Sequence, residues 1–324
     1  MNAQFTRHEL IFKQASGTSR GVLTTKETYL LEISENNKKG IGECAIFRGL
    51  SYDDVPDYEE KLTWLCENIH LDFEVLKKEL LHYPSIIFGL EQALLNLEHG
   101  EDLYFPSDFT DGKDSIKING LIWMGNADFM QSQIEEKLAK GFDCIKLKIG
   151  VDWKSEKEII KKLREKFPKE QLELRVDANG AFSYEEARMV LQELADLGIH
   201  SIEQPIKKSQ VKTKKSQETD EINSTDCCAP WNEMAKLCTE TPTPIALDEE
   251  LIGVIDFEEK KKLLETIKPQ YIILKPALVG GFSGSDEWIA IAESLGIDWW
   301  ITSALESNIG LNAICQYTYT KKNP

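Results

Sequence analysis

Charged side chains that recur at regular intervals in the second half of the chain are the residues best suited to carry out chemistry. Lys148, Asp177, Glu203, Asp248 and Lys275 each end a short apolar segment, and successive members are 29, 26, 45 and 27 residues apart. One strand, loop and helix unit of a barrel takes about 27 residues, and an insertion of roughly 20 residues explains the longer gap. The spacing therefore predicts that the five side chains gather at one end of consecutive parallel strands.

Three of these side chains predict a metal site. Asp177, Glu203 and Asp248 would supply carboxylate oxygens from separate strands, and Mg²⁺ binds such ligands while it keeps positions open for water and substrate. Mn²⁺ accepts the same kind of ligand set.

Lys148 could act as a general base if a fraction of its side chains is neutral, and the ammonium group of Lys146 would lower its pKa in that direction. The combination predicts metal-assisted removal of a proton next to a substrate carboxylate.

Alternation along the strands predicts which way these side chains point. In CIKLKI at 144–149, the lysines lie on one face and apolar residues on the other, and in LELRVD at 172–177 Arg175 and Asp177 share the polar face. The apolar face must contact the outer helices, so the charged residues would point inward. Each motif alone also fits a turn, a helix start or a structural ion pair. Their shared position at strand ends favours a single site.

The elements that must position these residues alternate between strand and helix. Helices are expected at 129–139 and 154–167, and strands are expected at 115–121, 144–150, 172–177, 200–203, 244–248, 271–275 and 298–303. This order predicts an α/β protein with a parallel sheet that closes into a (β/α) barrel. We find no glycine-rich phosphate loop after an early strand, which disfavours a dinucleotide-binding fold.

The first part of the chain has a different pattern. Segments at 29–33 and 39–44 flank a turn and predict a hairpin, and apolar residues at helical spacing before Gly100 predict a helix. We therefore expect an α+β domain over residues 1–112 and a barrel domain over residues 113–324. A polar insertion near 207–228 is expected to be a solvated loop.

Composition disfavours several classes of function. The 324 residues carry 38 Lys and Arg against 55 Asp and Glu, and the net charge of −17 disfavours binding to nucleic acid or to anionic membranes. The seven cysteines are scattered, and the sequence has neither a secretory signal nor a membrane-spanning run. These features predict a cytoplasmic protein that acts on a small molecule.

Six motifs resemble those of the enolase superfamily, in the subgroup of muconate-lactonizing enzymes that places lysines on the second and sixth barrel strands. Within it the chain is most similar to the o-succinylbenzoate synthase family, from Ser19 onward. The resemblance implies a modified TIM barrel of (β/α)7β type with an N-terminal α+β capping domain, whose loops at 18–21 and 47–50 would close over the barrel mouth. The motifs are IKLK at 145–148, RVDANG at 175–180, SIEQP at 201–205, ALDEE at 246–250, LKP at 274–276 and TSALES at 302–307.

The resemblance also implies roles for individual residues. Asp177, Glu203 and Asp248 would bind Mg²⁺. Lys148 would remove the proton alpha to the substrate carboxylate, and Lys275 would stay cationic opposite it. The implied reaction is the syn dehydration of 2-succinyl-6-hydroxy-2,4-cyclohexadiene-1-carboxylate to o-succinylbenzoate in menaquinone biosynthesis. Candidates for substrate binding or for support of the site are Lys146, Arg175, Asn179, Glu249, Ser303, Ser19 and Arg20.

Two other functions stay open at this point. A dipeptide epimerase or N-acylamino-acid racemase of the same superfamily would use the same metal and lysines, but the epimerases favour an acidic pair where this chain has TSALES at 302–307. Family members usually continue past 315–319 with a glycine-rich stretch, so the end at Pro324 predicts a short barrel and leaves a non-catalytic barrel as an alternative. The retained lysines and carboxylates argue against that alternative, because burying uncompensated charge is costly.

Overall fold

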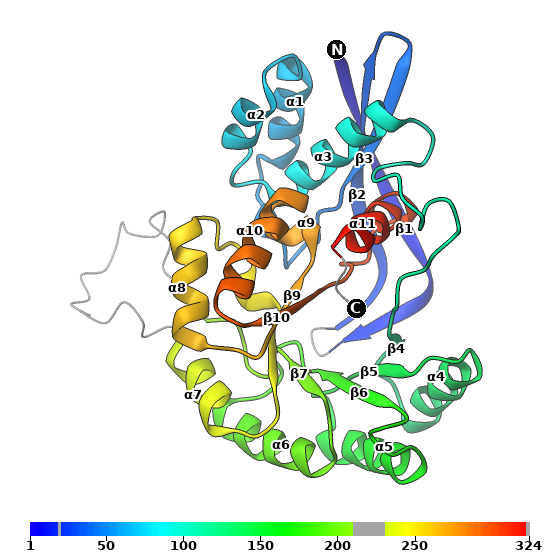
Figure 1. Ribbon diagram of the computed structural model, residues 1–324, viewed down its shortest axis with the longest axis vertical. Coiled ribbons are helices and arrows are strands. Elements are labelled where there is room, and N and C mark those ends of the chain that lie inside the picture. Colours follow the sequence, from blue (N-terminus) through cyan, green and yellow to red (C-terminus); the bar gives the residue numbers. More distant parts are fainter. Residues whose placement is uncertain (19–20, 210–230, 322–324) are drawn as a thin grey trace, which may run out of the picture.

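The structure is a computed structural model that describes residues 1–18, 21–209 and 231–321. It contains a three-stranded antiparallel sheet near the N-terminus and a seven-stranded parallel sheet in the rest of the chain (Figure 1). No helix among the described residues has both the length and the apolar character needed to cross a bilayer.

The antiparallel sheet has the order β1 (Asn2–Thr18), β2 (Gly21–Glu35) and β3 (Lys38–Cys44). The predicted hairpin is confirmed as β2 and β3. Its turn places Asn36 and Asn37 at φ values of 49° and 65°, a conformation that asparagine tolerates better than most residues. The alternation pattern did not predict β1, which pairs with β2 along most of its length.

Three helices complete the N-terminal part: α1 (Tyr58–Asn68), α2 (Phe73–Glu79) and α3 (Pro84–His99). Helix α3 begins with a proline, which suits the first turn of a helix, and it ends at Gly100 as the sequence predicts. Its apolar residues pack with the buried face of β2 in one core that includes Leu31, Ile33 and Leu90. This α+β unit carries a strand and a helix, β3 and α3, that contact the barrel.

The parallel sheet is curved, and its strand order follows the chain from β4 to β10 (Figure 1). Among the described residues, β4 and β10 are its edge strands. The first strand is shorter than the expected 115–121, because only its last part pairs with the neighbouring strand. The strands are β4 (Gly120–Ile122), β5 (Cys144–Lys148), β6 (Glu173–Asp177), β7 (Ser201–Glu203), β8 (Ile245–Leu247), β9 (Tyr271–Leu274) and β10 (Asp298–Ile301).

Helices cover the outer face of this sheet (Figure 1). Side-chain caps such as Asp152 before α5 and Ser183 before α6 fix where these helices begin. The outward residues of the strands, for example Ile145 and Leu147, are fully buried against them. The helices are α4 (Ala127–Ala139), α5 (Trp153–Lys166), α6 (Tyr184–Asp196), α7 (Asn232–Glu240), α8 (Phe257–Ile267), α9 (Pro276–Val279), α10 (Gly281–Ser294) and α11 (Asn308–Thr320), with a 3₁₀ turn at Glu249–Leu251.

An aromatic cluster joins the N-terminal domain to the barrel. Phe282 at the start of α10 lies with its ring centre 5.4 Å from that of Phe88 in α3 and 4.6 Å from that of Tyr317 in α11. These residues are buried and belong to one hydrophobic core. The N-terminal domain is therefore packed on the side of the barrel that contains α9, α10 and α11.

The predicted boundary between residues 112 and 113 remains a prediction. Most of the predicted insertion near 207–228 lies outside the described residues, as do the candidates Ser19 and Arg20.

Candidate active site

The parallel register brings the five recurring charged residues to one edge of the sheet. Lys148, Asp177 and Glu203 are the last residues of β5, β6 and β7, and the register pairs Lys148 with Asp177 and Asp177 with Glu203. Asp248 and Lys275 follow β8 and β9 directly. Carboxyl ends of parallel strands share one edge of a sheet, so these side chains converge although up to 127 residues separate them.

The three carboxylates of this group are almost completely buried. Asp177 is 0% exposed, Glu203 2% and Asp248 3%. Buried carboxylates require compensation by charge or by hydrogen bonds. Three lysine side chains supply it.

Lysine ammonium groups bridge neighbouring carboxylates. Lys146 Nζ lies 2.6 Å from Glu203 Oε2 and 3.7 Å from Asp177 Oδ2. Lys275 Nζ contacts Asp248 and lies 3.5 Å from Glu203 Oε1. Lys148 Nζ lies 2.5 Å from Asp177 Oδ2. Together the three lysines contact all three acids, and Glu203 and Asp177 each contact two lysines.

These interactions shift the pKa values of the site. Burial would lower the pKa of Lys146, but the carboxylates of Glu203 and Asp177 raise it above its usual value. Burial opposes ionisation of Glu203, yet Lys146 and Lys275 hold its pKa well below the usual range. Burial raises the pKa of Asp248 well above its usual value, and Glu249 and Glu203 add to this effect against Lys275. The lysines therefore favour the ionised form of Glu203, whereas burial and the neighbouring acids disfavour the ionised form of Asp248.

Asn179 links the acids to a lysine. Its backbone lies in the left-handed region at φ 46°, and its N–H donates to Asp177 Oδ1 at 3.0 Å. Its side chain accepts from Lys148 Nζ at 2.8 Å and donates to Glu249 Oε1 at 3.0 Å. Asn179 thus connects the Lys148 ammonium group to Asp177 and Glu249.

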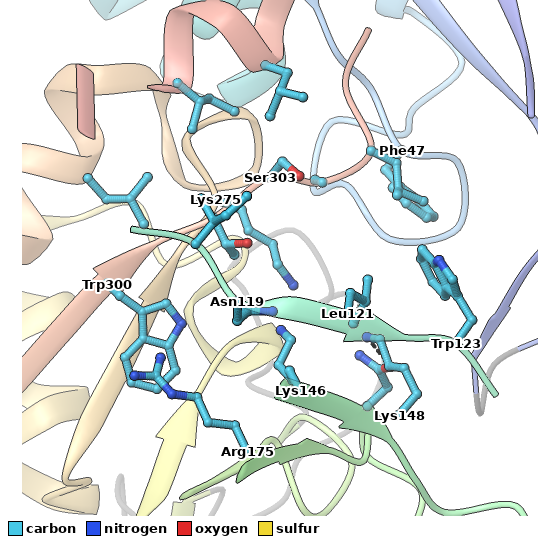
Figure 2. Close-up of a pocket in the computed structure, with 18 of the residues that line it drawn as sticks. Phe47, Asn119, Leu121, Trp123, Lys146, Lys148, Arg175, Lys275, Trp300 and Ser303 are labelled. Carbon is cyan, nitrogen blue, oxygen red and sulfur yellow. Dashed lines mark hydrogen bonds between the residues drawn. The ribbon is translucent and has the colours of Figure 1, made fainter. Parts of the chain in front are cut away.

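Arg175 lies deeper in the barrel. Its guanidinium group stacks 4.4 Å from the centre of the Trp300 ring, and its Nε donates to Glu173 Oε1 at 2.6 Å. Figure 2 shows this pair on the same side of the cavity, away from Phe47. Arg175 therefore lines the cavity. Its charge is paired with Glu173, and Trp300 covers one face of its guanidinium group.

A cavity of about 810 Å³ lies in front of the lysines (Figure 2). The segments 21–23, 47–50 and 302–305, strands β4 and β10, and helix α11 contribute residues to its lining. Of the predicted site residues described here, those that line it are Lys146, Lys148, Arg175, Asn179, Lys275 and Ser303. The three carboxylates contact these lysines, and Figure 2 shows all three lysine side chains directed into the same space.

Sequence reasoning missed several residues that line this cavity. Asn119, Trp123 and Trp300 face the cavity, and the three were not among the predicted site residues. For Trp300 a signal existed, because alternation along 298–301 places it on the face opposite to buried Trp299. Asn119 and Trp123 flank a short edge strand, where alternation is too brief to distinguish one face from the other.

The donor set suits a hard divalent cation. Three carboxylates on neighbouring strand ends, with Glu249 next to them, outnumber the three lysines that neutralise them. Within residues 1–18, 21–209 and 231–321, no three acidic, cysteine or histidine side chains stand in a ready-made metal-binding arrangement. Asp177, Glu203 and Asp248 are the side chains that would hold such a cation, and it would act there as a Lewis acid.

Comparison with known proteins gives the family. The family model for the enolase C-terminal domain-like fold matches residues 130–221 and 226–324, and the model for the MenC N-terminal domain matches residues 2–97. An o-succinylbenzoate synthase from Desulfotalea psychrophila is 41% identical over 98% of this chain and 90% of its own. These matches cover the N-terminal domain as well as the barrel.

Solved structures agree with this assignment. The crystal structure of MenC from Desulfotalea psychrophila superposes with a TM-score of 0.82 at 38% identity, over 100% of this chain and 91% of its own. The o-succinylbenzoate synthase from Thermosynechococcus elongatus, solved with Mg in its active site, has the same fold at 22% identity, with a TM-score of 0.75 over 100% of this chain and 91% of its own. The predicted barrel with an N-terminal capping domain is therefore confirmed, and the chain belongs to the o-succinylbenzoate synthase family of the enolase superfamily.

Proposed function

We propose that this protein is an o-succinylbenzoate synthase, a hydro-lyase that dehydrates 2-succinyl-6-hydroxy-2,4-cyclohexadiene-1-carboxylate. One observation supports the proposal most strongly. Lys148 and Lys275 reach one cavity from β5 and from the end of β9, and the carboxylates of the three intervening strands lie between them. This arrangement suits removal of a proton next to a substrate carboxylate.

We assign the proton transfers to Lys148. As a free amine its Nζ takes the proton from the ring carbon that bears the substrate carboxylate, and the electrons of that C–H bond pass into an enediolate. The C–O bond to the ring hydroxyl then breaks as a new ring double bond forms. Lys148 returns the proton to the departing hydroxyl group, which leaves as water, and the ring becomes aromatic.

The surroundings of Lys148 fit both halves of this cycle. Its Nζ donates to Asp177 Oδ2 and Asn179 Oδ1, and these acceptors hold the ammonium form that delivers a proton to the leaving group. Lys146 and Lys275 contribute two further positive charges to the site. One residue therefore serves as base and then as acid on the same face of the ring, as a syn elimination requires.

Lys275 has a different part in the proposal. Burial opposes its charge, but Asp248 and Glu203 raise its pKa, so it remains an ammonium group. A fixed positive charge across the cavity from Lys148 stabilises the negative charge that develops on the substrate. Lys275 thus acts electrostatically and transfers no proton.

A divalent cation, Mg²⁺ or Mn²⁺, is part of the proposal. We assign its binding to Asp177, Glu203 and Asp248, and it would act as a Lewis acid for the substrate carboxylate when bound. Support comes from the oxygen donors and from the excess of acid described above.

The cytoplasm is the proposed location, since the five described cysteines are free thiols.

The racemase and epimerase alternatives use the same lysines and differ in the wall opposite them. In the 302–305 wall, the side chains that line the cavity belong to Thr302, Ser303, Ala304 and Leu305, which carry no acid to hold a substrate ammonium group. The carboxylate of neighbouring Glu306 is turned to the backbone two residues earlier, where its Oε2 accepts from the N–H of Ala304 at 2.6 Å. This wall favours a substrate without an amino group.

Turnover by the purified protein with Mg²⁺ tests the proposal. The cyclohexadiene substrate should be converted to product, followed by the absorbance of the new aromatic ring. A dipeptide and an N-succinylamino acid, followed by the change of optical rotation, are the matched comparison substrates. Faster turnover of either one than of the cyclohexadiene would reverse the assignment.

A further inference from the structure

A carboxylate from the capping domain caps the helix that follows the cavity wall at 302–305. Glu43 on β3 is fully buried, and its Oε1 and Oε2 lie 3.0 and 2.9 Å from the backbone nitrogen of Ser307. Its Oε2 also accepts from Ser307 Oγ at 2.6 Å and from the N–H of Gly310 at 3.0 Å. A carboxylate at the N-terminus of a helix satisfies free N–H groups and interacts favourably with the helix dipole. Glu43 therefore fixes the start of α11.

A second carboxylate of the same domain makes the corresponding contact on α10. Glu91 on α3 accepts from the N–H of Phe282 at 2.5 Å and from the N–H of Ser283 at 3.2 Å. Both contacts need a glycine on the helix. A Cβ on Gly310 would lie 2.8 Å from Glu43 Oε2, and one on Gly281 would collide with Glu91 Oε2. The capping domain is thus bound to two consecutive barrel helices in the same way.

Lys26 holds the same cavity wall at a second point. It is buried on β2, and its Nζ donates to the carbonyl oxygen of Leu305 at 3.2 Å. Leu305 has a φ of 61°, a left-handed conformation that costs a leucine about 1–2 kcal/mol and persists only when neighbours enforce it. The same ammonium group lies 5.8 Å from the ring centre of Phe47 at the cavity mouth. The wall is therefore anchored at Leu305 and at Ser307.

We infer that Glu43 and Lys26 are positioning residues for substrate selection, because they hold the backbone of 302–305 in the shape that faces the substrate. This inference rests on the proposed function for its kinetic readout. Lys148, to which proton transfer is assigned, lies on β5, and Lys275, which acts through its charge, follows β9, so neither belongs to these anchors. Loss of an anchor should therefore weaken substrate binding much more than it slows the chemical step.

The variant E43Q tests this inference. Glutamine keeps the shape of the side chain, but in either amide orientation its NH₂ group replaces an oxygen that accepts from the N–H of Ser307. At the Oε2 position it would also face the N–H of Gly310, and at the Oε1 position it would face the hydroxyl group of Thr28. Loss of hydrogen bonds to a charged acceptor should raise KM about tenfold or more, while kcat stays within about threefold. The variant K26M removes the bond to Leu305 and should shift KM in the same direction, which keeps the test available if E43Q does not fold.

E91Q is the matched control, since it alters the same kind of helix cap on α10. It should leave KM unchanged. Hydrogen exchange followed by mass spectrometry gives a readout that does not depend on activity. E43Q should speed exchange at Ser307 and Gly310, and E91Q should speed exchange at Phe282 and Ser283 only. A double variant E43Q/S307A should raise KM by less than the product of the two single effects, because both changes break the same contact.

Four outcomes decide whether the inference holds. An unchanged KM in E43Q and K26M, or an equal rise of KM in E91Q, overturns the inference. A fall of kcat with KM unchanged overturns it as well, since the anchors would then support the chemistry itself. If the unaltered protein turns over no cyclohexadiene substrate, the proposed function fails, and unchanged exchange across 302–310 in E43Q then refutes the positioning role independently.

Discussion

Replacing Lys148 by methionine is the most direct test of the proposed chemistry. Methionine keeps an unbranched side chain of similar length, but it removes the ammonium group that lies 2.5 Å from Asp177 Oδ2 and 2.8 Å from Asn179 Oδ1. A positioned acid or base accelerates a proton transfer by about 10²–10⁴-fold. We expect kcat to fall by that factor, which raises the barrier by about 3–5 kcal/mol.

The same substitution also affects folding, and the two effects must be separated. Asp177 is 0% exposed, and in K148M its nearest remaining ammonium group would be that of Lys146 at 3.7 Å. Removing one partner of a buried ion pair costs about 3–5 kcal/mol. Lys260 offers a matched control, since it is 3% exposed, pairs with Glu287 at 2.7 Å and lies outside the cavity. K260M should lose stability and retain turnover.

The assay combines turnover at saturating substrate with urea unfolding of both variants. Activity is measured at a temperature at which each variant is more than nine-tenths folded. A K148M protein that is folded and retains more than about one tenth of the original kcat would refute the assignment of Lys148, because a catalytic base contributes at least about 10²-fold.

Three further predictions concern the metal and the domain contacts. Mg²⁺ at about 100 times its Kd should raise the free energy of unfolding by about 2.7 kcal/mol, and absence of a shift in calorimetry contradicts the carboxylate assignment. Burial raises the pKa of Glu91 from 4.5 to about 7, so the folded state holds this proton more tightly than the unfolded state. Stability should therefore fall as pH rises from about 4.5 to about 7, by at most about 3 kcal/mol, and E91Q should remove this part of the pH dependence measured by urea unfolding. The variant G310A should lose about 1–3 kcal/mol by overpacking against Glu43, partly offset by about 1 kcal/mol of helix propensity. G281A should lose more in the same measurement, because its φ of 76° adds backbone strain, and equal losses would contradict the reasoning.

The row of charged residues was predictable because it follows from local rules. Alternation within five residues determines that Lys146 and Lys148 share a face, and the repeat of the barrel unit brings Asp177 and Glu203 to the same edge. Which carboxylate each lysine contacts was not predictable. Lys146 passes over its neighbour strand to reach Glu203, a choice that depends on side-chain geometry across the whole sheet.

The long strand β1 and the domain anchors were missed for two different reasons. The register of β1 shifts between Ile11 and Ser16, and many of its residues are exposed, so no clean alternation runs along it. The contact between Glu43 and Ser307 spans 264 residues, and nothing near Glu43 in the sequence indicates a helix start in another domain. Such contacts arise only when both domains have folded and docked.

The two helix caps made by Glu43 and Glu91 have a mechanical consequence. Both fixed points lie on the same side of the barrel, at α11 and α10, whereas the 47–50 loop of the capping domain lies at the cavity mouth. The same domain makes two more contacts with the barrel, from Lys26 to the carbonyl oxygen of Leu305 and from Phe88 to Phe282. Contacts at several points oppose rotation of the capping domain as a rigid body, and they keep the edge that carries Phe47 in register with the wall at 302–305.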